Sequence, residues 1–327
     1  MQLLTKLAGI GGSADAITRL LREFSLPGAG VSSAGVSSAG FRALWVNQAD
    51  FWLSLLKCLI LGASSERCLH MSVKIDALRR YPVKGLSGQV LESVQLERGQ
   101  GFPCDRKFGF ARPGSGFDCN NPKPLAKTKF YMLARDSALA VLSSEFDDKT
   151  GTLSLSAADS NGEFDITTTE GKQTASLFLK SYLSLPADET PTLYEASPHR
   201  FTDVSVVSTE MMNAVSIINL DSVIEFSKDI GQHVDPRRFR GNIHLSGLTP
   251  FTELEMVDRT IAIGTVQLRV VSRTKRCPAT EVDLTTGERD LKTPKLLLKK
   301  YGHMDMGVYA EVMQGGLIAE GDEVKFI

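Results

Sequence analysis

The sequence predicts a mainly β protein with a few short helices, an α+β fold built from barrel or sandwich layers. Many short segments alternate apolar and polar residues with the period of a strand, whereas segments with helical spacing are few and short. Strand patterns also do not alternate regularly with helices, as they would in a fold of βαβ units. The chain has 327 residues, of which 42% are hydrophobic, and this excludes a mainly disordered protein.

The expected elements follow from local periodicity and from turn residues. Helical spacing occurs in 136–146, with Asp136 as its N-cap, and in 174–183 and 208–218. Strands are expected, in chain order, at 73–78, 90–97, 107–111, 152–155, 261–271 and 324–326, the fifth being a hairpin that turns near Gly264.

Changes in composition and in strand patterning along the sequence predict three regions, at 1–70, 71–196 and 197–327. In the first region, a tandem Val-Ser-Ser-Ala-Gly repeat at 31–40 predicts a flexible linker. The apolar segment 51–63 is too short for a spanning helix, which needs roughly 20 residues. We therefore expect this region to be either a weak membrane or organelle-targeting leader or sequence upstream of a true start at Met71.

Charge and cysteine content exclude several classes of protein. Lys and Arg number 37 against 38 Asp and Glu, whereas a bulk nucleic-acid binder is normally basic, so no nucleic-acid partner is expected. Five cysteines do not make a disulfide scaffold and favour a reducing, cytoplasmic environment. Organelle or membrane association through residues 1–70 is the alternative. The sequence contains no phosphate-binding loop, no nucleophile elbow and no Cys-x-x-Cys pair.

One segment stands out chemically. Cys277 follows three basic residues within four positions, Arg273, Lys275 and Arg276. Positive charge favours the thiolate, which is the form that binds soft metals or attacks electrophiles. Because Pro278 cannot extend strand pairing, Cys277 is expected at a strand end that faces a cleft. On local composition alone, the alternative is a buried, inert thiol beside a solvated basic strand.

Further basic positions strengthen this candidate site. Arg240 and Asn242 lie in a basic cluster, and the planar guanidinium fork suits phosphate. Lys84 stands on a turn after the first expected strand, and Arg106 follows a glycine-rich loop. Each could be an ordinary surface residue, but together with Cys277 they predict a site for a small anion beside a reactive thiolate.

Taken in order, these residues resemble the MOSC family, which is named for the C-terminal domain of molybdenum cofactor sulfurase. The resemblance runs from about residue 73 to 327 and implies a MOSC-like β-barrel core with an N-terminal β-barrel-like subdomain in 71–196. It is carried by Tyr81-Pro82-Val83-Lys84, Asp105-Arg106, Phe239-Arg240-Gly241-Asn242, Arg276-Cys277, Thr280, Val282-Asp283, Thr286-Gly287, Gly307-Val308-Tyr309 and 316–322.

The chain also departs from the family pattern. Gly85 and Gly241 stand where the family usually has Ser and Pro. Lys275 replaces a small residue that is common in the amidoxime-reducing members, and Thr202 falls where those members have Ser in a lid segment.

The resemblance implies a cofactor and a set of residues that hold it. In the amidoxime-reducing members a pterin dithiolene holds molybdenum and one protein cysteine completes the sulfur ligation, so Cys277 is implied as the molybdenum ligand and catalytic residue. No pyridoxal phosphate site is seen, and residues 1–70 are too few to encode the desulfurase domain of a complete sulfurase. The positions implied to hold the cofactor (Mo-pyranopterin) are Lys84, Arg106, Thr202, Arg240, Asn242 and Arg276.

Two functions follow from the resemblance. The first is a molybdenum cofactor-binding oxidoreductase that reduces small N-hydroxylated or related substrates. Its electrons would come from a separate cytochrome b5-like or ferredoxin-like partner with its reductase. The alternative is a non-redox carrier of molybdenum cofactor or sulfur, in which Cys277 holds a persulfide or a metal. A β domain whose cofactor site has decayed is disfavoured, because Cys277 and the basic residues are all retained.

Overall fold

The computed structural model describes residues 72–327, and Met71–Ile327 form one compact unit. The leader, linker and apolar segment expected within 1–70 lie outside the described residues. The described part is mainly β, as the sequence predicts. No helix within 72–327 is both long enough and apolar enough to cross a membrane.

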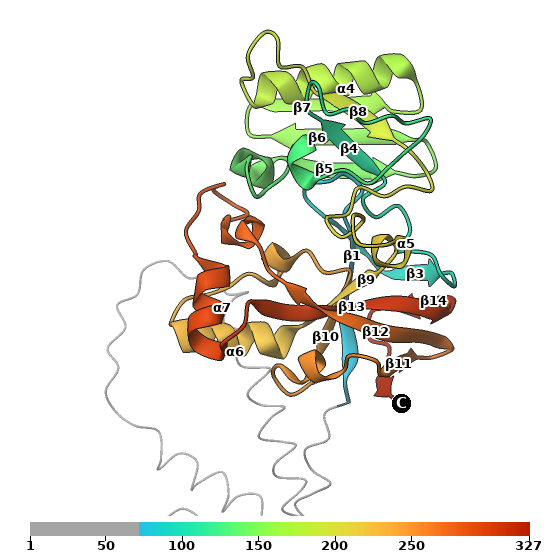
Figure 1. The fold of residues 1–327 in the computed structure, drawn as a ribbon, viewed down its shortest axis with the longest axis vertical. Coiled ribbons are helices and arrows are strands. Elements are labelled where there is room, and N and C mark those ends of the chain that lie inside the picture. Colours follow the sequence, from blue (N-terminus) through green and yellow to red (C-terminus); the bar gives the residue numbers. More distant parts are fainter. Residues whose placement is uncertain (1–71) are drawn as a thin grey trace, which may run out of the picture. The chain divides into compact units, whose positions relative to one another are not determined.

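An eight-stranded sheet curls into a half-barrel and forms the base of the fold, here called the large sheet (Figure 1). Its neighbouring strands are antiparallel except for the parallel pair β9 and β10. In order across the sheet these are β15 (Val324–Phe326), β11 (Thr260–Ile263), β12 (Val266–Lys275), β13 (Asp305–Gln314), β9 (Val215–Asn219), β10 (Ile243–Ser246), β1 (Lys74–Arg80) and β2 (Gln89–Leu91).

The parallel pair needs a crossover, and α6 (Leu220–Ile230) provides it between β9 and β10. The fold therefore contains one βαβ unit, which the sequence interpretation did not expect. Asn219 caps α6 by accepting a hydrogen bond from Asp221 N, and Gly231 ends the helix in the left-handed conformation. A second helix, α7 (Thr293–Tyr301), packs beside α6.

Alternating apolar residues give the large sheet a buried face. On β12, Leu268 and Val270 are fully buried while Arg269 between them is exposed. The same core takes Ile75 and Leu78 from β1, so it includes residues from both sides of the predicted border at 196/197. β1 and β2 are the only two strands that the large sheet takes from 71–196, within the described residues.

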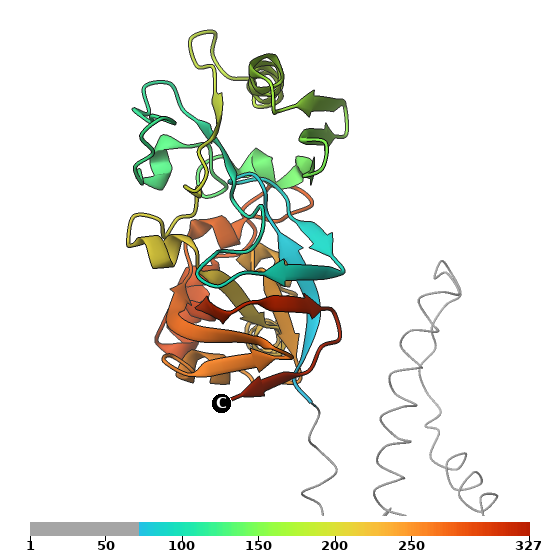
Figure 2. The same ribbon diagram turned by 90° about the vertical axis from the view of Figure 1, so that its right-hand side faces the viewer.

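Residues 108–195 form a second layer, here called the small lobe, which lies to one side of the large sheet (Figure 2). Its core also takes Val83, Leu86 and Val282 from outside this range. Its strands are β4 (Phe108–Ala111), paired with β8 (Thr192–Glu195), and the sheet β5 (Ser143–Asp147), β6 (Thr152–Ala157) and β7 (Ser160–Asp165). The helix α4 (Thr169–Tyr182) packs on β7 and β8. A further pair, β3 (Ser93–Leu96) with β14 (Gly316–Ala319), completes the strands.

All six expected strand segments contain strand, although 90–97 holds two strands with a break at Glu92. The hairpin expected at 261–271 is confirmed by the antiparallel pairing of β11 and β12 around Gly264. The helix expected at 174–183 is also confirmed, but it begins earlier because Thr168 caps it through a hydrogen bond from Gly171 N.

Two of the expected helices are wrong over half their length. In 136–146, a 3-10 helix covers only Ser137–Val141 and the rest is β5; Asp136 makes no cap hydrogen bond through its side chain. In 208–218, α5 covers only Thr209–Met212 and β9 follows. Both runs are short and apolar, so their spacing fits either period, and pairing with distant strands decides the outcome.

We expect a chain that starts at Met71 to unfold as the full chain does, because residues 72–327 supply the two main cores that the structure describes and terminal segments are often loosely attached. The midpoint of thermal unfolding should change by less than about 2 °C, the shift that roughly 1 kcal/mol produces in a chain of this size. A drop of several degrees would show that residues 1–70 contribute to the fold.

Candidate functional site

A pocket of about 320 Å³ brings together all seven residues that the sequence analysis selected. They come from five separate segments: the turn between β1 and β2, the loop between β3 and β4, the loop after β8, the segment before β10 and the end of β12. These lining residues are Lys84, Arg106, Thr202, Arg240, Asn242, Arg276 and Cys277.

Cys277 lies at the end of β12, as expected from Pro278. The strand stops at Lys275, and a 3-10 helix, Pro278–Glu281, begins directly after the cysteine. The hydroxyl of Thr280 donates to the Cys277 carbonyl at 2.9 Å and fixes this turn. The prediction of a strand-end cysteine that faces a cleft is therefore confirmed.

Arg289 holds two walls of the pocket together. Its Nη1 donates to the carbonyl of Pro278 at 2.8 Å, and its Nη2 donates to the carbonyl of Ala134 at 2.7 Å. Ala134 and Cys277 both line the pocket, so one guanidinium group connects the cysteine turn to the small lobe.

Two largely buried arginines share one aromatic ring, but only one of them has a carboxylate partner among the described residues. Arg106 forms an ion pair with Asp105, whereas Arg240 has no carboxylate partner within 72–327 and donates to the Leu86 carbonyl at 2.6 Å. Both guanidinium groups stack on Tyr81, 4.5 and 4.3 Å from the ring centre. Burial, followed by the charge of Arg106, lowers the pKa of Arg240 to about 10, so the side chain stays charged at neutral pH.

The backbone at these two arginines is unusual. Arg106 has a φ of 50° and Arg240 a φ of 54°, the left-handed conformation that residues other than glycine seldom adopt. Neighbouring hydrogen bonds hold both, since Arg106 N donates to the Tyr81 carbonyl at 2.8 Å and Arg240 N to the Arg237 carbonyl at 3.0 Å. Backbone strain of this kind is concentrated at functional sites.

Arg276 is buried and bound by backbone carbonyls alone. It donates through Nη1 to Phe239 at 2.9 Å and through Nε to Met306 at 2.8 Å. Burial lowers its pKa to about 10, so a second charged guanidinium lines the pocket without a carboxylate partner among the described residues. Next to it, Gly307 allows β13 to approach β9 closely, because a Cβ there would lie 2.3 Å from the Ile217 carbonyl oxygen and 3.3 Å from Arg276 Nη2.

Both polar atoms of the Asn242 side-chain amide form hydrogen bonds with backbone groups. Its Oδ1 accepts from Ser216 N at 3.1 Å, and its Nδ2 donates to the Arg79 carbonyl at 3.1 Å. The side chain thereby joins β9 to β1 at the back of the pocket. The sequence analysis proposed Asn242 as a donor to an anion, but in this structure its amide fixes the strands that carry the arginines.

One carboxylate serves two lysines next to the cysteine. Asp203 forms ion pairs with buried Lys84 and with Lys127, the latter at 3.2 Å, and Lys127 lines the same pocket as Cys277. Although burial alone would raise the pKa of Asp203, the two ammonium groups hold that pKa well below its usual range. Burial lowers the pKa of Lys84 despite this pairing. Burial likewise acts to lower the pKa of Lys127, but Asp203 and Cys277 raise it overall.

Two hydroxyl groups in the pocket are buried without a hydrogen-bond partner among the described residues, Thr202 Oγ1 and Thr274 Oγ1. Leaving a buried polar atom unpaired costs free energy, so such atoms indicate a place where a polar ligand can bind.

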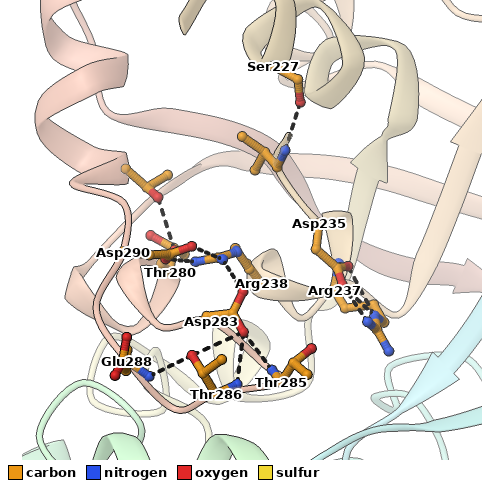
Figure 3. Close-up of polar contacts among 12 residues, drawn as sticks. Ser227, Asp235, Arg237, Arg238, Thr280, Asp283, Thr285, Thr286, Glu288 and Asp290 are labelled. Atoms are coloured by element: carbon orange, nitrogen blue, oxygen red, sulfur yellow. Dashed lines mark hydrogen bonds and ion pairs between the residues drawn. The ribbon is translucent and has the colours of Figure 1, made fainter. Parts of the chain in front are cut away.

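The pocket lining is strongly positive, with eight basic residues and only two acidic ones. One of the eight, Arg238, is neutralised by Asp283 at 2.9 Å and Asp290 at 2.7 Å (Figure 3). Arg237 pairs with Asp235 away from the pocket, as the same view shows. Carboxylates thus neutralise Arg237 and Arg238 of the basic cluster, but not Arg240. The positive charge that remains in the pocket favours an anionic ligand.

The lining residues that were not selected from the sequence include Tyr309, Asp203, Thr274 and Lys127, all of them polar. Tyr309 could have been found, since it belongs to a motif that carried the family resemblance, and Asp203 is next to Thr202. Thr274 and Lys127 carry no such signal. Lys127 comes from the small lobe and meets Cys277 only through the fold.

The other described cysteines lie outside the pocket. Burial raises the pKa of Cys104, and the charge of Asp148 adds to the effect. The thiolate of Cys104 is therefore disfavoured by burial rather than by the adjacent Asp105. Asp105 instead accepts from Tyr81 N at 2.7 Å and pairs with Arg106. Cys119 is exposed.

Comparison with protein families identifies the chain. Residues 72–191 match the MOSC N-terminal beta barrel domain, and residues 199–325 match the MOSC domain. The chain therefore belongs to the MOSC family, which confirms the resemblance seen in its motifs. This family is associated with proteins that bind the molybdenum cofactor, and MOSC domains often occur in enzymes related to that cofactor.

Similar solved structures are distant. A crystal structure of the YUAD protein from Bacillus subtilis has 12% sequence identity and a TM-score of 0.37, covering 78% of this chain and 96% of that one. YiiM from Geobacillus stearothermophilus has 19% identity and a TM-score of 0.28, covering 35% of this chain and 53% of that one. A comparison with curated protein sequences finds no match.

The stacked ring of Tyr81 predicts a measurable effect on anion binding. Tyr81→Phe should bind inorganic phosphate as the wild type does, because the ring remains and the hydroxyl has no partner among the described residues. Tyr81→Leu should weaken binding by about fivefold, since a stacked guanidinium contributes on the order of 1 kcal/mol. Phosphate-dependent shifts in thermal unfolding measure both variants. Equal phosphate affinity in Tyr81→Leu and wild type would contradict this role for the ring.

Proposed function

We propose that this pocket binds the molybdenum cofactor (Mo-pyranopterin) and that the protein uses it to reduce small N-hydroxylated or related N–O or S–O compounds. One observation carries the proposal: Cys277 lines a pocket in which two guanidinium groups, those of Arg240 and Arg276, have no carboxylate partner within the described residues. A soft sulfur ligand suits a thiophilic metal, and uncompensated positive charge suits the phosphate of a pterin.

The residues present fit such a group. Arg106, Arg240 and Lys84 offer charged donors at one part of the pocket. Burying their charges without full compensation is costly, and an anionic phosphate would offset that cost. The unpaired hydroxyls of Thr202 and Thr274 would gain hydrogen-bond partners.

Cys277 would be the protein's ligand to the metal, with Arg276 beside it. Within 72–327, no three His, Cys, Asp or Glu side chains gather as a separate metal site.

The division of work between cofactor and protein follows from these positions. When bound, the cofactor would supply a redox-active metal, while the protein binds, orients and compensates charge. The overall conversion of an N-hydroxyl group takes two electrons and two protons and releases the oxygen as water. We propose that the electrons come from a separate protein, cytochrome b5-like or ferredoxin-like, together with its reductase.

The test is to prepare the full chain in a host that makes the molybdenum cofactor. Metal and pterin are then measured, and amidoxime reduction is assayed with a chemical electron donor. Molybdenum and pterin in near-equal amounts, together with turnover, would support the proposal. A protein that binds both but does not turn over would favour the carrier function instead. Absence of both would exclude the cofactor.

Cys277→Ala should abolish turnover while the protein still folds, because the side chain lines a pocket rather than a core. Loss of a ligand should exceed the roughly 10- to 100-fold loss caused by removing an outer partner of a metal ligand. Cys104→Ala and Cys119→Ala, both outside the pocket, serve as controls and should retain most activity. Full activity in Cys277→Ala with wild-type molybdenum content would refute the assignment.

Arg240→Ala should lower pterin retention, because it removes a charged donor that has no carboxylate partner among the described residues. Loss of one charge-assisted hydrogen bond, worth about 1.5 kcal/mol or more, corresponds to roughly tenfold weaker binding. Arg237→Ala is the matched control, since Arg237 lies three residues away but pairs with Asp235 outside the pocket. Retained pterin should be quantified after gel filtration. If both variants retain it equally, Arg240 does not hold the cofactor.

A further inference from the structure

The cysteine side of the pocket contains a lysine from the small lobe. A 3-10 helix, Lys127–Lys129, places its first residue in the pocket lining and leaves Lys129 outside it, exposed to solvent. The ammonium group of Lys127 lies 3.2 Å from Asp203, and Lys127 lines the same pocket as Cys277. Its side chain is 34% exposed, so it is reachable by a molecule that enters from solvent.

Positive charge exceeds negative charge around this sulfur. Asp203 is divided between Lys127 and Lys84, and Lys84 is almost fully buried, with 6% of its side chain exposed. On the other flank of the cysteine, Arg273 and Lys275 form no ion pair within 72–327, although both line the pocket. Four cationic side chains thus line the pocket together with Cys277, and Asp203 is the only carboxylate among the described residues that pairs with any of them.

The same side of the pocket has an apolar wall. Met132, Leu133, Val204 and Ala279 line it alongside the charged groups. The combination of an apolar wall and surplus positive charge suits an organic molecule that carries an anionic group, because apolar contact binds its body and the cations bind its charge.

We propose that Lys127 is a specificity-determining residue that makes the pocket prefer substrates carrying a carboxylate near the group to be reduced. This inference rests on the function proposed above and adds the charge class of the substrate to it. The reduction consumes two electrons from the donor and two protons, and the carboxylate of the substrate is unchanged.

The test compares two aromatic amidoximes that differ only by a ring carboxylate, using full-length, cofactor-loaded protein and a chemical electron donor. The wild type should show a higher kcat/KM for the carboxylate compound by about threefold to tenfold, mainly through KM, as expected for a partly exposed ion pair. Raising the salt concentration should reduce this preference.

Substitutions of Lys127 test whether the preference for the carboxylate compound depends on this side chain. Lys127→Met should bring the ratio of the two kcat/KM values near one, Lys127→Glu should invert it, and Lys127→Arg should retain it. Lys129→Met is the matched control and should keep the wild-type ratio, because Lys129 is outside the pocket. Calorimetric binding of the two amidine products, with and without the ring carboxylate, gives the same comparison without turnover.

The outcomes are distinct. If the wild type reduces neither compound, the proposed function fails and the substrate class falls with it. If it reduces both without preference, or if Lys127→Met keeps the preference, the function stands and the role of Lys127 is refuted. Loss of molybdenum and pterin from Lys127→Met would also refute it, since Lys127 would then hold the cofactor rather than select the substrate.

Discussion

The pocket depends on hydrogen bonds from cationic side chains to backbone carbonyls. Arg276 donates to Met306 and Phe239, and Arg240 donates to Leu86. A carbonyl satisfies an N–H donor, but unlike a carboxylate it does not cancel the charge. The arginines are therefore fixed in place by neutral acceptors, and their charge remains available to a ligand.

This arrangement also explains why the pocket needs both halves of the chain. The carbonyl of Leu86 follows β1, whereas those of Phe239 and Met306 come from the C-terminal half. Asn242 adds a bond from the segment before β10 to the end of β1. The stacked Tyr81 supplies the polarisable surface on which two like-charged groups lie close together.

Sequence reasoning was most successful where chemistry is local. Cys277 was placed at a strand end because proline cannot extend a strand, and the basic motifs predicted the residues that meet around it. It failed where distant pairing decides, as in β9, whose apolar residues fit a helix equally well. Lys127 has no local signature, since only the packing of the small lobe brings it to the sulfur.

The position of β1 in the large sheet decides whether the two matched regions can be treated as separate domains. β1 pairs with β10, so a polypeptide covering only 199–325 would leave the apolar strand Ile243–Ser246 as an open edge. Open apolar edges recruit other strands and lead to aggregation. The two matched regions are therefore not interchangeable parts. In an exchange between relatives they would have to move together, because a boundary drawn from sequence matches cuts through a single hydrogen-bonded sheet.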